Sequence, residues 1–370
     1  MKGRPTDRDA SAFAPELAAR LAALLRQIDP EADAERGVLE VAKLLSEAST
    51  PPLEDGLLSV VVRNHTTKRA DLLDEALFSL ACSDHRPLEI VLASQAPEMD
   101  ARRQLEELLA RHTALAEGVT ARLVHAPSRH DERGKLANAG IAAARGRYLA
   151  FLDDDDVVYP SHHASLVRAL QDGDRAWAVG RARKVAITRT TDGWYVRSKS
   201  RWGAGDAFDL ARLARDNHVP VHAYVVDRAR VRGLRVMFAE DLPAQEDYAF
   251  LLRLSGLFRP TIVDGPPGCE YRFRDDGTNA TPHADAPVAA QVAGARRWSR
   301  SESAVARARA EAVALLSMDE VAALSPESVT APAGAPAPLR HRLADRLNAA
   351  VKRLPGVHAF LKATLGKDRR

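Results

Sequence analysis

Apolar and amphipathic stretches alternate along the chain between residues 57 and 152. Short runs of β-branched and aliphatic residues, such as Leu57 to Val62, are typical of strands that a parallel sheet buries on both faces. The stretches between these runs repeat their apolar side chains at helical spacing. The pattern predicts strands at 57–62, 88–93, 122–125 and 148–152, and helices at 72–80, 100–116 and 135–144. Such alternation predicts a doubly wound α/β sheet flanked by helices.

The pattern is less regular after Pro160. It predicts a helix at 161–171, strands at 177–187 and 194–197, and a helix at 245–255. Residues 287–325 are rich in Ala, Arg and Glu and are also expected to be helical. Before the sheet, the apolar spacing over 13–48 predicts two amphipathic helices, which end at Pro51 because proline cannot continue a helix.

These boundaries divide the chain into a central domain and its extensions. An N-terminal helical extension (1–52) precedes an α/β domain with a mixed sheet (53–285). A helical extension (286–330), a linker of alternating Ala, Gly and Pro (331–338) and a C-terminal amphipathic helix (339–370) follow it.

The composition is that of a globular protein. Apolar residues make up 46% of the 370 residues, which is enough for a sizeable core. The two cysteines, Cys82 and Cys269, lie far apart, which favours a reducing compartment. No apolar run approaches the roughly 20 residues of a transmembrane helix, and the first residues lack the apolar core of a signal peptide. The sequence therefore predicts a cytoplasmic protein.

Charge is distributed unevenly along the chain. The chain carries a net charge of +3 and residues 339–370 carry +7, so that the rest carries −4. An acidic body argues against nucleic-acid binding. In the basic segment, apolar residues recur about every four positions, at Leu339, Leu343, Leu347, Val351 and Leu354. A helix of this kind lies on an anionic membrane surface, as at the inner face of the cell membrane, or packs against protein. Both alternatives stay open.

The acidic run Asp153–Asp156 directly follows the apolar strand predicted at 148–152. The strand's end lies at the carboxyl edge of the sheet, where open α/β folds bind ligands. Ionised carboxylates there need a cation or hydrogen-bond donors, and two of them could hold one hard divalent cation. For an isolated acidic run, a solvated turn is the commoner interpretation.

Two adjacent segments carry a family resemblance. GRYLAFLDDDDVVYPSHHASLVRAL resembles the acidic segment of family 2 glycosyltransferases, which have the GT-A fold, and GKLANAGIAAARG resembles the helix before it. The resemblance implies Mn²⁺ or Mg²⁺ on the diphosphate of a sugar nucleotide, with Asp155 as metal ligand. Asp153 would share the metal or contact the ribose. Asp154, Lys135 and Asn138 would lie on the nucleotide side.

The first two strands resemble the nucleotide-binding strands of the same family. In SVVVRNHTTKRADLLDEALFSL the usual proline is replaced by Arg63, which could pair with a phosphate or orient a carboxylate. Asn64 is expected beside the nucleotide. The second strand, LEIVLASQAP, ends in Ser94 and Gln95, where the family usually has an aspartate that contacts the nucleotide. Ser94 remains a candidate nucleotide contact, and the change leaves the nucleotide's identity open.

A third match lies about 90 residues after the acidic run. Glu246 and Asp247, at the start of a predicted helix, resemble the family's catalytic carboxylates. An acceptor hydroxyl needs a base that takes its proton as it attacks the anomeric carbon. The resemblance implies Asp247 as this base, with Glu246 as the alternative. A pair favoured by the helix dipole is the simpler explanation for the motif alone.

Two further segments near the base motif are weaker candidates. The segment from Asn217 to His222 could line the acceptor side, with His222 as a weak candidate. Arg272 and Arg274, in the sequence YRFR, could reach the diphosphate, although surface arginines are common.

The resemblance covers roughly residues 55–280. It implies an inverting, metal-dependent hexosyltransferase that moves a sugar from a nucleoside-diphosphate sugar to an acceptor hydroxyl. The acceptor would be a glycan or a lipid-linked precursor of a bacterial cell-envelope polysaccharide. One alternative is a catalytically silent binding or scaffold protein, suggested by Ser94 and Gln95. A nucleotidyltransferase is disfavoured because residues 63–70 lack the glycine-rich loop usual in that class.

Overall fold

The computed structural model describes residues 52–201, 208, 210–213, 217–231, 238–240, 242–274, 292, 294–302 and 305. The helices expected at 13–48, the linker and the C-terminal helix lie outside the described residues, as does most of 286–330. Of the last segment, residues 294–302 are helical, as the composition predicts.

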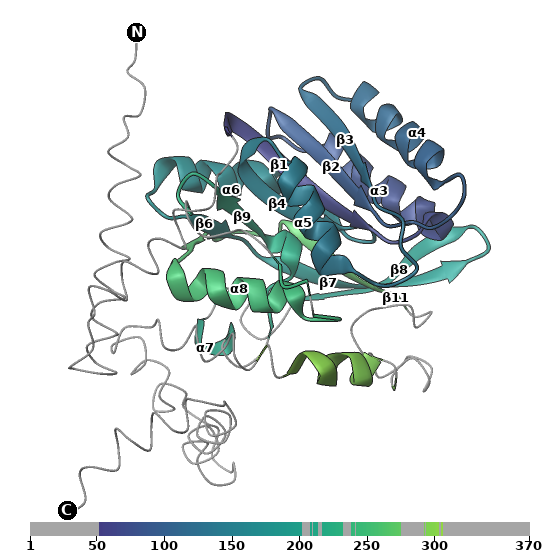
Figure 1. Cartoon of the computed structure of the whole chain (residues 1–370). Helices are drawn as coiled ribbons and strands as arrows, with labels where there is room; N and C mark the ends of the chain where they lie inside the picture. Colours follow the sequence, from purple (N-terminus) through teal and green to yellow (C-terminus); the bar gives the residue numbers. More distant parts are fainter. Residues whose placement is uncertain are drawn as a thin grey trace, which may run out of the picture.

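A seven-stranded sheet runs through the described domain in the order β10-β6-β9-β4-β1-β2-β3 (Figure 1). Its strands are β1 (Glu54–Asn64), β2 (Leu88–Ser94), β3 (Val119–His125), β4 (Gly146–Asp153), β6 (Trp177–Val179), β9 (Tyr224–Asp227) and β10 (Thr261–Ile262). The strands β3, β2, β1 and β4 are parallel, whereas β9 is antiparallel to β4 and β6. The predicted mixed, doubly wound sheet is therefore confirmed.

Helices connect these strands, and all but the four-residue helix at 210–213 lie where the periodicity predicts them. They are α3 (Ala70–Ala81), α4 (Ala101–Ala114), α5 (Arg133–Ala143), α6 (Ser161–Asp172), α7 (Leu210–Leu213) and α8 (Glu246–Leu257), with 3₁₀ turns η1 (Thr67–Arg69) and η2 (Val221–Ala223). Helix α5 packs on β1 and β2 and also contacts α8. This packing is close, since a Cβ atom on Gly140 of α5 would lie 2.4 Å from Val61 Cγ1.

A second, four-stranded sheet has the order β5-β11-β7-β8. It consists of β5 (Val157–Val158), β11 (Cys269–Arg274), β7 (Ala182–Thr190) and β8 (Gly193–Arg201). The single strand expected at 177–187 is wrong, because the chain leaves the first sheet after β6 and enters the second as β7. Strand β5 follows the acidic run directly and pairs with β11. The second sheet thus begins beside the carboxyl end of β4.

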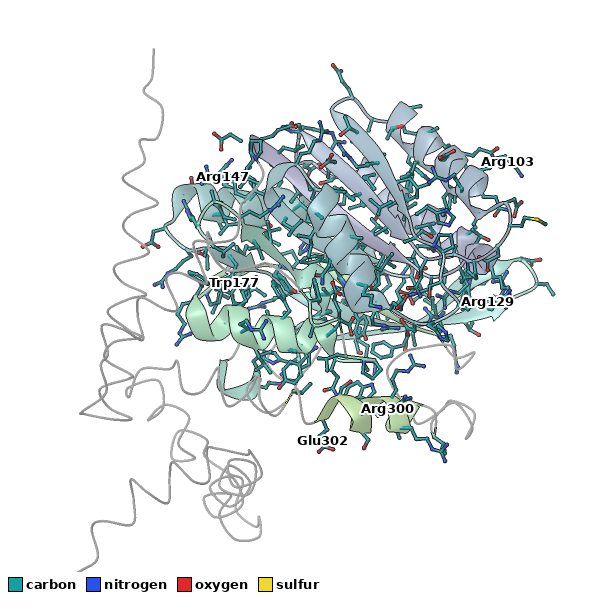
Figure 2. The ribbon with its side chains drawn as sticks, in the orientation of Figure 1. Arg103, Arg129, Arg147, Trp177, Arg300 and Glu302 are labelled. Atoms are coloured by element: carbon teal, nitrogen blue, oxygen red, sulfur yellow. The ribbon has the colours of Figure 1, made fainter. Side chains whose placement is uncertain are left out.

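The core lies on the faces of the seven-stranded sheet. Strand β1 is buried from Leu57 to Asn64. The indole of Trp177 packs against the rings of Tyr224 and Phe208, at centroid distances of 5.9 and 5.3 Å, and its Nε1 donates to the Phe258 carbonyl oxygen at 2.7 Å. Figure 2 shows Trp177 inside the body of the protein and Arg103 at its outer surface. Among the described helices, none is long and apolar enough to cross a membrane.

Candidate active site

A cleft of about 660 Å³ opens where β1 and β4 end. The loops after β1, β2, β3 and β4 contribute to its lining, together with the start of α8 and the end of β11. Its acidic side chains are Glu98, Asp131, Asp153, Asp154, Asp155, Glu246 and Asp247. Its Arg and Lys side chains are Arg63, Lys68, Arg69, Arg129, Arg133, Arg272, Arg274 and Arg297. This density of both charges suits a polar, multiply charged ligand.

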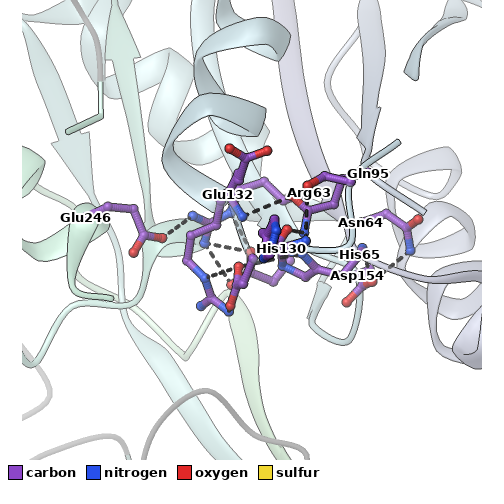
Figure 3. Close-up of polar contacts among 12 residues, drawn as sticks. Arg63, Asn64, His65, Gln95, His130, Glu132, Asp154 and Glu246 are labelled. Atoms are coloured by element: carbon purple, nitrogen blue, oxygen red, sulfur yellow. Dashed lines mark hydrogen bonds and ion pairs between the residues drawn. The ribbon is translucent and has the colours of Figure 1, made fainter. Parts of the chain in front are cut away.

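Arg63, near the end of β1, joins two distant parts of the cleft. Its Nε and Nη2 donate to the two carboxylate oxygens of Asp153, at 2.7 and 3.0 Å. Its Nη1 donates to Glu246 Oε1 at 2.7 Å, as Figure 3 shows. The guanidinium is only 3% exposed. We call this arrangement the Arg63 bridge, because it links the acidic run to the acidic pair Glu246–Asp247.

Asp153 is ionised over a wide pH range. Burial alone would raise the pKa of this carboxyl, but the bidentate contact with Arg63 outweighs burial and lowers the pKa to about 2. The parallel register of β1 and β4 places Arg63 opposite Asp153. A strand pairing therefore sets the distance between the two groups.

The other carboxylates of the acidic run have different partners. Asp154 Oδ2 accepts a hydrogen bond from Asn64 Nδ2 at 2.8 Å, drawn in Figure 3. Asp155 forms an ion pair with Arg274 at the end of β11. Asp156 is fully buried, and its Oδ2 lies 3.2 Å from His222 Nδ1. Burial lowers the pKa of His222, but the charge of Asp156 outweighs burial and raises it well above its usual value.

Glu246 and Asp247 begin helix α8. The residue before them, Gln245, has a φ of 61°, a left-handed conformation that is costly for a residue with a side chain. Burial raises the pKa of Asp247, and the neighbouring Asp153 charge adds to this effect. Burial also raises the pKa of Glu246, which pairs with Arg63. Of the two carboxylates, Asp247 is the less buried.

Ser94 and Gln95 have structural partners. Ser94 is fully buried, and its hydroxyl donates to Asn64 Oδ1 at 2.7 Å. Gln95 Nε2 donates to the His130 carbonyl oxygen at 2.9 Å, and its Oε1 accepts from the Glu132 backbone N–H at 3.2 Å. The side chains of Ser94 and Gln95, which stand where the family usually has an aspartate, are neutral. Their hydrogen bonds are made within the protein. Neither Ser94 nor Asn64 lines the cleft, and Asn64 instead positions Asp154.

Two predicted nucleotide contacts lie away from the cleft. Lys135 is exposed and its Nζ donates to Glu132 Oε1 at 2.5 Å. Asn138 is buried, and its side chain bonds the backbone of Phe238 and the Glu240 carboxylate. The side chains of α5 that the resemblance points to therefore hold the helix in place and do not face the cleft. A direct nucleotide contact by either residue has no support in this geometry.

Two cleft segments escaped prediction. The loop before α5 contributes Arg129, His130 and Asp131, and the first residue of α5 contributes Arg133. The helical segment 294–302 contributes Trp298 and Arg297, whose Nη1 donates to Asp131 Oδ2 at 3.1 Å. The dense charges of the loop were a usable signal. The helical segment carried no such signal, because its composition predicts a helix but not the surface on which that helix packs.

The acidic run offers carboxylate oxygens to a divalent cation. Among the residues that the structure describes, no group of three or more His, Cys, Asp or Glu side chains is arranged to hold a metal. Asp153 and Asp155 both line the cleft, however. Mg²⁺ usually uses one or two carboxylates and takes its other ligands from substrate phosphates and water. The two aspartates are donors of the type that such a site uses, although each also pairs with an arginine, and they do not form a closed protein cage.

Comparison with known proteins agrees with the family resemblance seen in the sequence. Residues 59–224 match the sequence profile of the family described as Glycosyl transferase family 2. The succinoglycan biosynthesis protein ExoO of Rhizobium meliloti (strain 1021) is 27% identical over 186 residues, which cover 45% of this chain and 50% of ExoO. An uncharacterized glycosyltransferase of Nostoc sp. is 29% identical over 117 residues, 32% of this chain and 34% of that protein. The chain thus spans half or less of these relatives.

A solved structure supports the fold. S. aureus TarS 1–349 in complex with UDP matches with a TM-score of 0.50 at 13% identity, over 85% of this chain and 93% of TarS. At this identity the likeness is one of fold alone, and it confirms the GT-A type architecture that the resemblance implies.

Proposed function

Because the chain carries a glycosyl transferase family 2 domain over residues 59–224, we propose that it transfers a hexosyl group from a nucleoside-diphosphate sugar to an acceptor hydroxyl. The Arg63 bridge carries this proposal. One buried guanidinium holds the acidic run at one end and the acidic pair at the other. We propose that the acidic run binds the donor and that the acidic pair supplies the base. Transfer with inversion needs these two functions on opposite sides of the anomeric carbon.

Asp247 is the proposed base. It lines the cleft, and its raised pKa makes it a stronger base for an acceptor hydroxyl at neutral pH. Its carboxylate takes the proton as the acceptor oxygen attacks the anomeric carbon and the bond to the diphosphate breaks. Glu246 is the alternative, but its use as a base would break a buried ion pair with Arg63. His222 lines the same cleft and stays a weak candidate on the acceptor side.

The acidic run is the proposed donor site. Asp153 and Asp154 line the cleft and are our candidates for contacts with the nucleotide, while Asn64 and Ser94 position Asp154 from behind. A Mn²⁺ or Mg²⁺ ion held by Asp155, with Asp153 as second carboxylate, would neutralise the charge that develops on the leaving diphosphate. The UDP bound to TarS supports a nucleoside diphosphate as the donor's leaving group.

A glycan or lipid-linked acceptor is the proposed second substrate. The named role of ExoO in succinoglycan biosynthesis supports a polysaccharide pathway. A lipid-linked acceptor would agree with membrane contact through the basic segment 339–370, which lies outside the described residues.

A panel of sugar nucleotides tests the proposal. We expect the protein to bind one or more of them by calorimetry in the presence of Mn²⁺ and to release its nucleoside diphosphate slowly without acceptor. Asp155→Ala should abolish metal-dependent turnover. Asp247→Asn should lower turnover by about 10²-fold or more while donor binding persists.

Each result has a contrary outcome. Full turnover by Asp155→Ala would show that the metal ligand is assigned wrongly. Failure of the wild-type protein to bind any sugar nucleotide would remove the enzyme proposal and favour the scaffold alternative.

A further inference from the structure

Asp155, the carboxylate proposed to hold a divalent cation, already contacts a cation of the protein. Arg274 Nη1 forms an ion pair with Asp155 Oδ2. Asp155 follows β4 of the seven-stranded sheet, whereas Arg274 is the last residue of β11 in the four-stranded sheet. Both side chains line the cleft. The second sheet therefore delivers a positive charge to the acidic run of the first.

This pair differs from its neighbours in the acidic run. Asp153 is 28% exposed but accepts hydrogen bonds from Nε and Nη2 of Arg63, whereas Asp156 is fully buried beside His222. Asp155 is 16% exposed and faces the cleft, while its partner Arg274 is 3% exposed. A cation that enters from the cleft can reach Asp155, but it competes there with the Arg274 guanidinium.

The Arg274 guanidinium and a divalent cation oppose each other's binding at Asp155, because both are positively charged. A guanidinium in contact with a carboxylate oxygen and a divalent cation bound to the same carboxylate would lie a few ångströms apart. Their repulsion inside a protein cleft is large compared with thermal energy, because little water screens it. Each cation therefore weakens the binding of the other to this carboxylate.

We propose that Arg274 is an internal competitor for the divalent cation at Asp155 and thereby couples metal binding to donor binding. The inference rests on the proposed metal role of Asp155. Once it leaves Asp155, the Arg274 guanidinium remains in the cleft, and its planar fork suits phosphate oxygens. A bound diphosphate compensates this charge. Metal is then held weakly by the protein alone and tightly together with the donor, and by linkage the reverse holds equally.

Mn²⁺ binding to the full-length protein without donor tests this inference. The free Mn²⁺ signal in electron paramagnetic resonance would be measured for the wild type, Arg274→Gln and Arg189→Gln. We expect Arg274→Gln to bind Mn²⁺ about tenfold tighter, which corresponds to about 1.4 kcal/mol. Arg189→Gln is the matched control, because Arg189 lies on β7 of the same sheet but pairs with Asp71 and does not line the cleft. It should change the affinity by about twofold or less.

Two additions make the test specific. UDP should tighten Mn²⁺ binding in the wild type, and by a smaller factor in Arg274→Gln, because the competitor is already gone. Adding Asp155→Asn to Arg274→Gln should remove the gain in Mn²⁺ affinity. If Arg274→Gln does not fold, Arg274→Lys replaces it, with an expected gain of about threefold because lysine keeps the charge but loses the fork.

The outcomes separate this inference from the proposed function. Equal Mn²⁺ affinity in the wild type, Arg274→Gln and Arg189→Gln would overturn the competition. If Asp155→Ala nevertheless abolishes turnover, the proposed function stands without the competition. Unchanged Mn²⁺ binding by Arg274→Gln after Asp155→Asn would show that the metal lies elsewhere. The competition and the assignment of Asp155 as metal ligand would then both fail, whereas the proposed glycosyl transfer would not be affected.

Discussion

Arg63 illustrates how one residue can organise a site. Burial lowers its pKa, but ion pairs with Asp153 and Glu246 outweigh burial and raise the pKa well above its usual value. The guanidinium is therefore a fixed positive charge between two carboxylates. Loss of one partner from such a buried network leaves an uncompensated charge and typically costs about 3–5 kcal/mol. Arg63 is thus a positioning residue whose effect reaches the proposed base, Asp247, through its field.

Substitution of Arg63 should change the pH profile. The charge of Arg63 lowers the pKa of Asp247, so that Arg63→Met should let this pKa rise further. A base acts only when deprotonated, and activity is lost as the pH falls through its pKa. The acidic limb of kcat/KM should therefore move to higher pH, with kcat lower by about tenfold or more. Profiles measured on Arg63→Met and on the charge-preserving Arg63→Lys check this.

The lysine variant serves as the control. Arg63→Lys keeps the charge and should shift the limb much less, although it loses the two-armed contact with Asp153. An unmoved acidic limb in a folded Arg63→Met protein would exclude an effect of Arg63 on the base.

At the scale of elements, strand ends and helix starts position the cleft. Strands β1 and β4 pair in parallel, so that Arg63 and Asp153 end side by side. Helix α5 lies close to this pair, because Gly140 lets its backbone approach Val61. Asn138 then links α5 to Phe238 and Glu240, near the start of α8. Helix packing thus connects the donor side with the base side.

Gly140→Ala should loosen that packing. The added Cβ would lie 2.4 Å from Val61 Cγ1, and overpacking of this kind costs about 1–3 kcal/mol. Urea unfolding would measure the loss, with the exposed Ala142→Ser on the same helix as a control expected within about 0.5 kcal/mol of the wild type. In a Val61→Ala background the cost of Gly140→Ala should fall, since the colliding methyl is gone. An equal cost in both backgrounds would contradict the contact as its cause.

At the scale of the whole molecule, two sheets and a helical segment meet at one cleft. The seven-stranded sheet supplies Arg63 and Asp153, the four-stranded sheet supplies Arg274, and the segment 294–302 supplies Arg297 and Trp298. The chain also separates its charge, with +7 in residues 339–370 and −4 in the rest. If the basic segment contacts an anionic surface, as the sequence allows, the acidic body gains no electrostatic attraction to that surface.

Membrane contact by the basic segment has a direct test. Replacing Arg340, Arg342 and Arg346 with Glu in the full-length protein should weaken binding to phosphatidylserine vesicles by about 100-fold or more, since each basic residue contributes about 1 kcal/mol there. Sedimentation with vesicles measures this, and neutral phosphatidylcholine vesicles are the control. If the wild-type protein does not bind anionic vesicles at low salt, the result would favour the alternative, in which the segment packs on protein.

Strongly periodic elements were predictable and short ones were not. Strands β1 to β4 and helices α3 to α6 and α8 appear where the apolar pattern places them, within a few residues. Strands β9, β10 and β11 have four, two and six residues and escaped prediction. Strand β10 is too short for a period to register, and three of the six residues of β11 are charged, which hides its apolar positions. The strands that pair with β9 and β11 lie far away in the chain. Strand β11 matters most, because it delivers Arg274 to the cleft.

The sequence by itself determined that an acidic run ends a buried strand and that an acidic pair begins a later helix, because strand direction and helix start are local properties. It also carried the family resemblance, which the profile over residues 59–224 bears out. Only the tertiary structure decided which charges meet. Arg63 reaches Glu246 across 183 positions, and Arg274 reaches Asp155 from another sheet. Such contacts depend on strand order and on how the two sheets join, which the spacing of apolar residues does not encode.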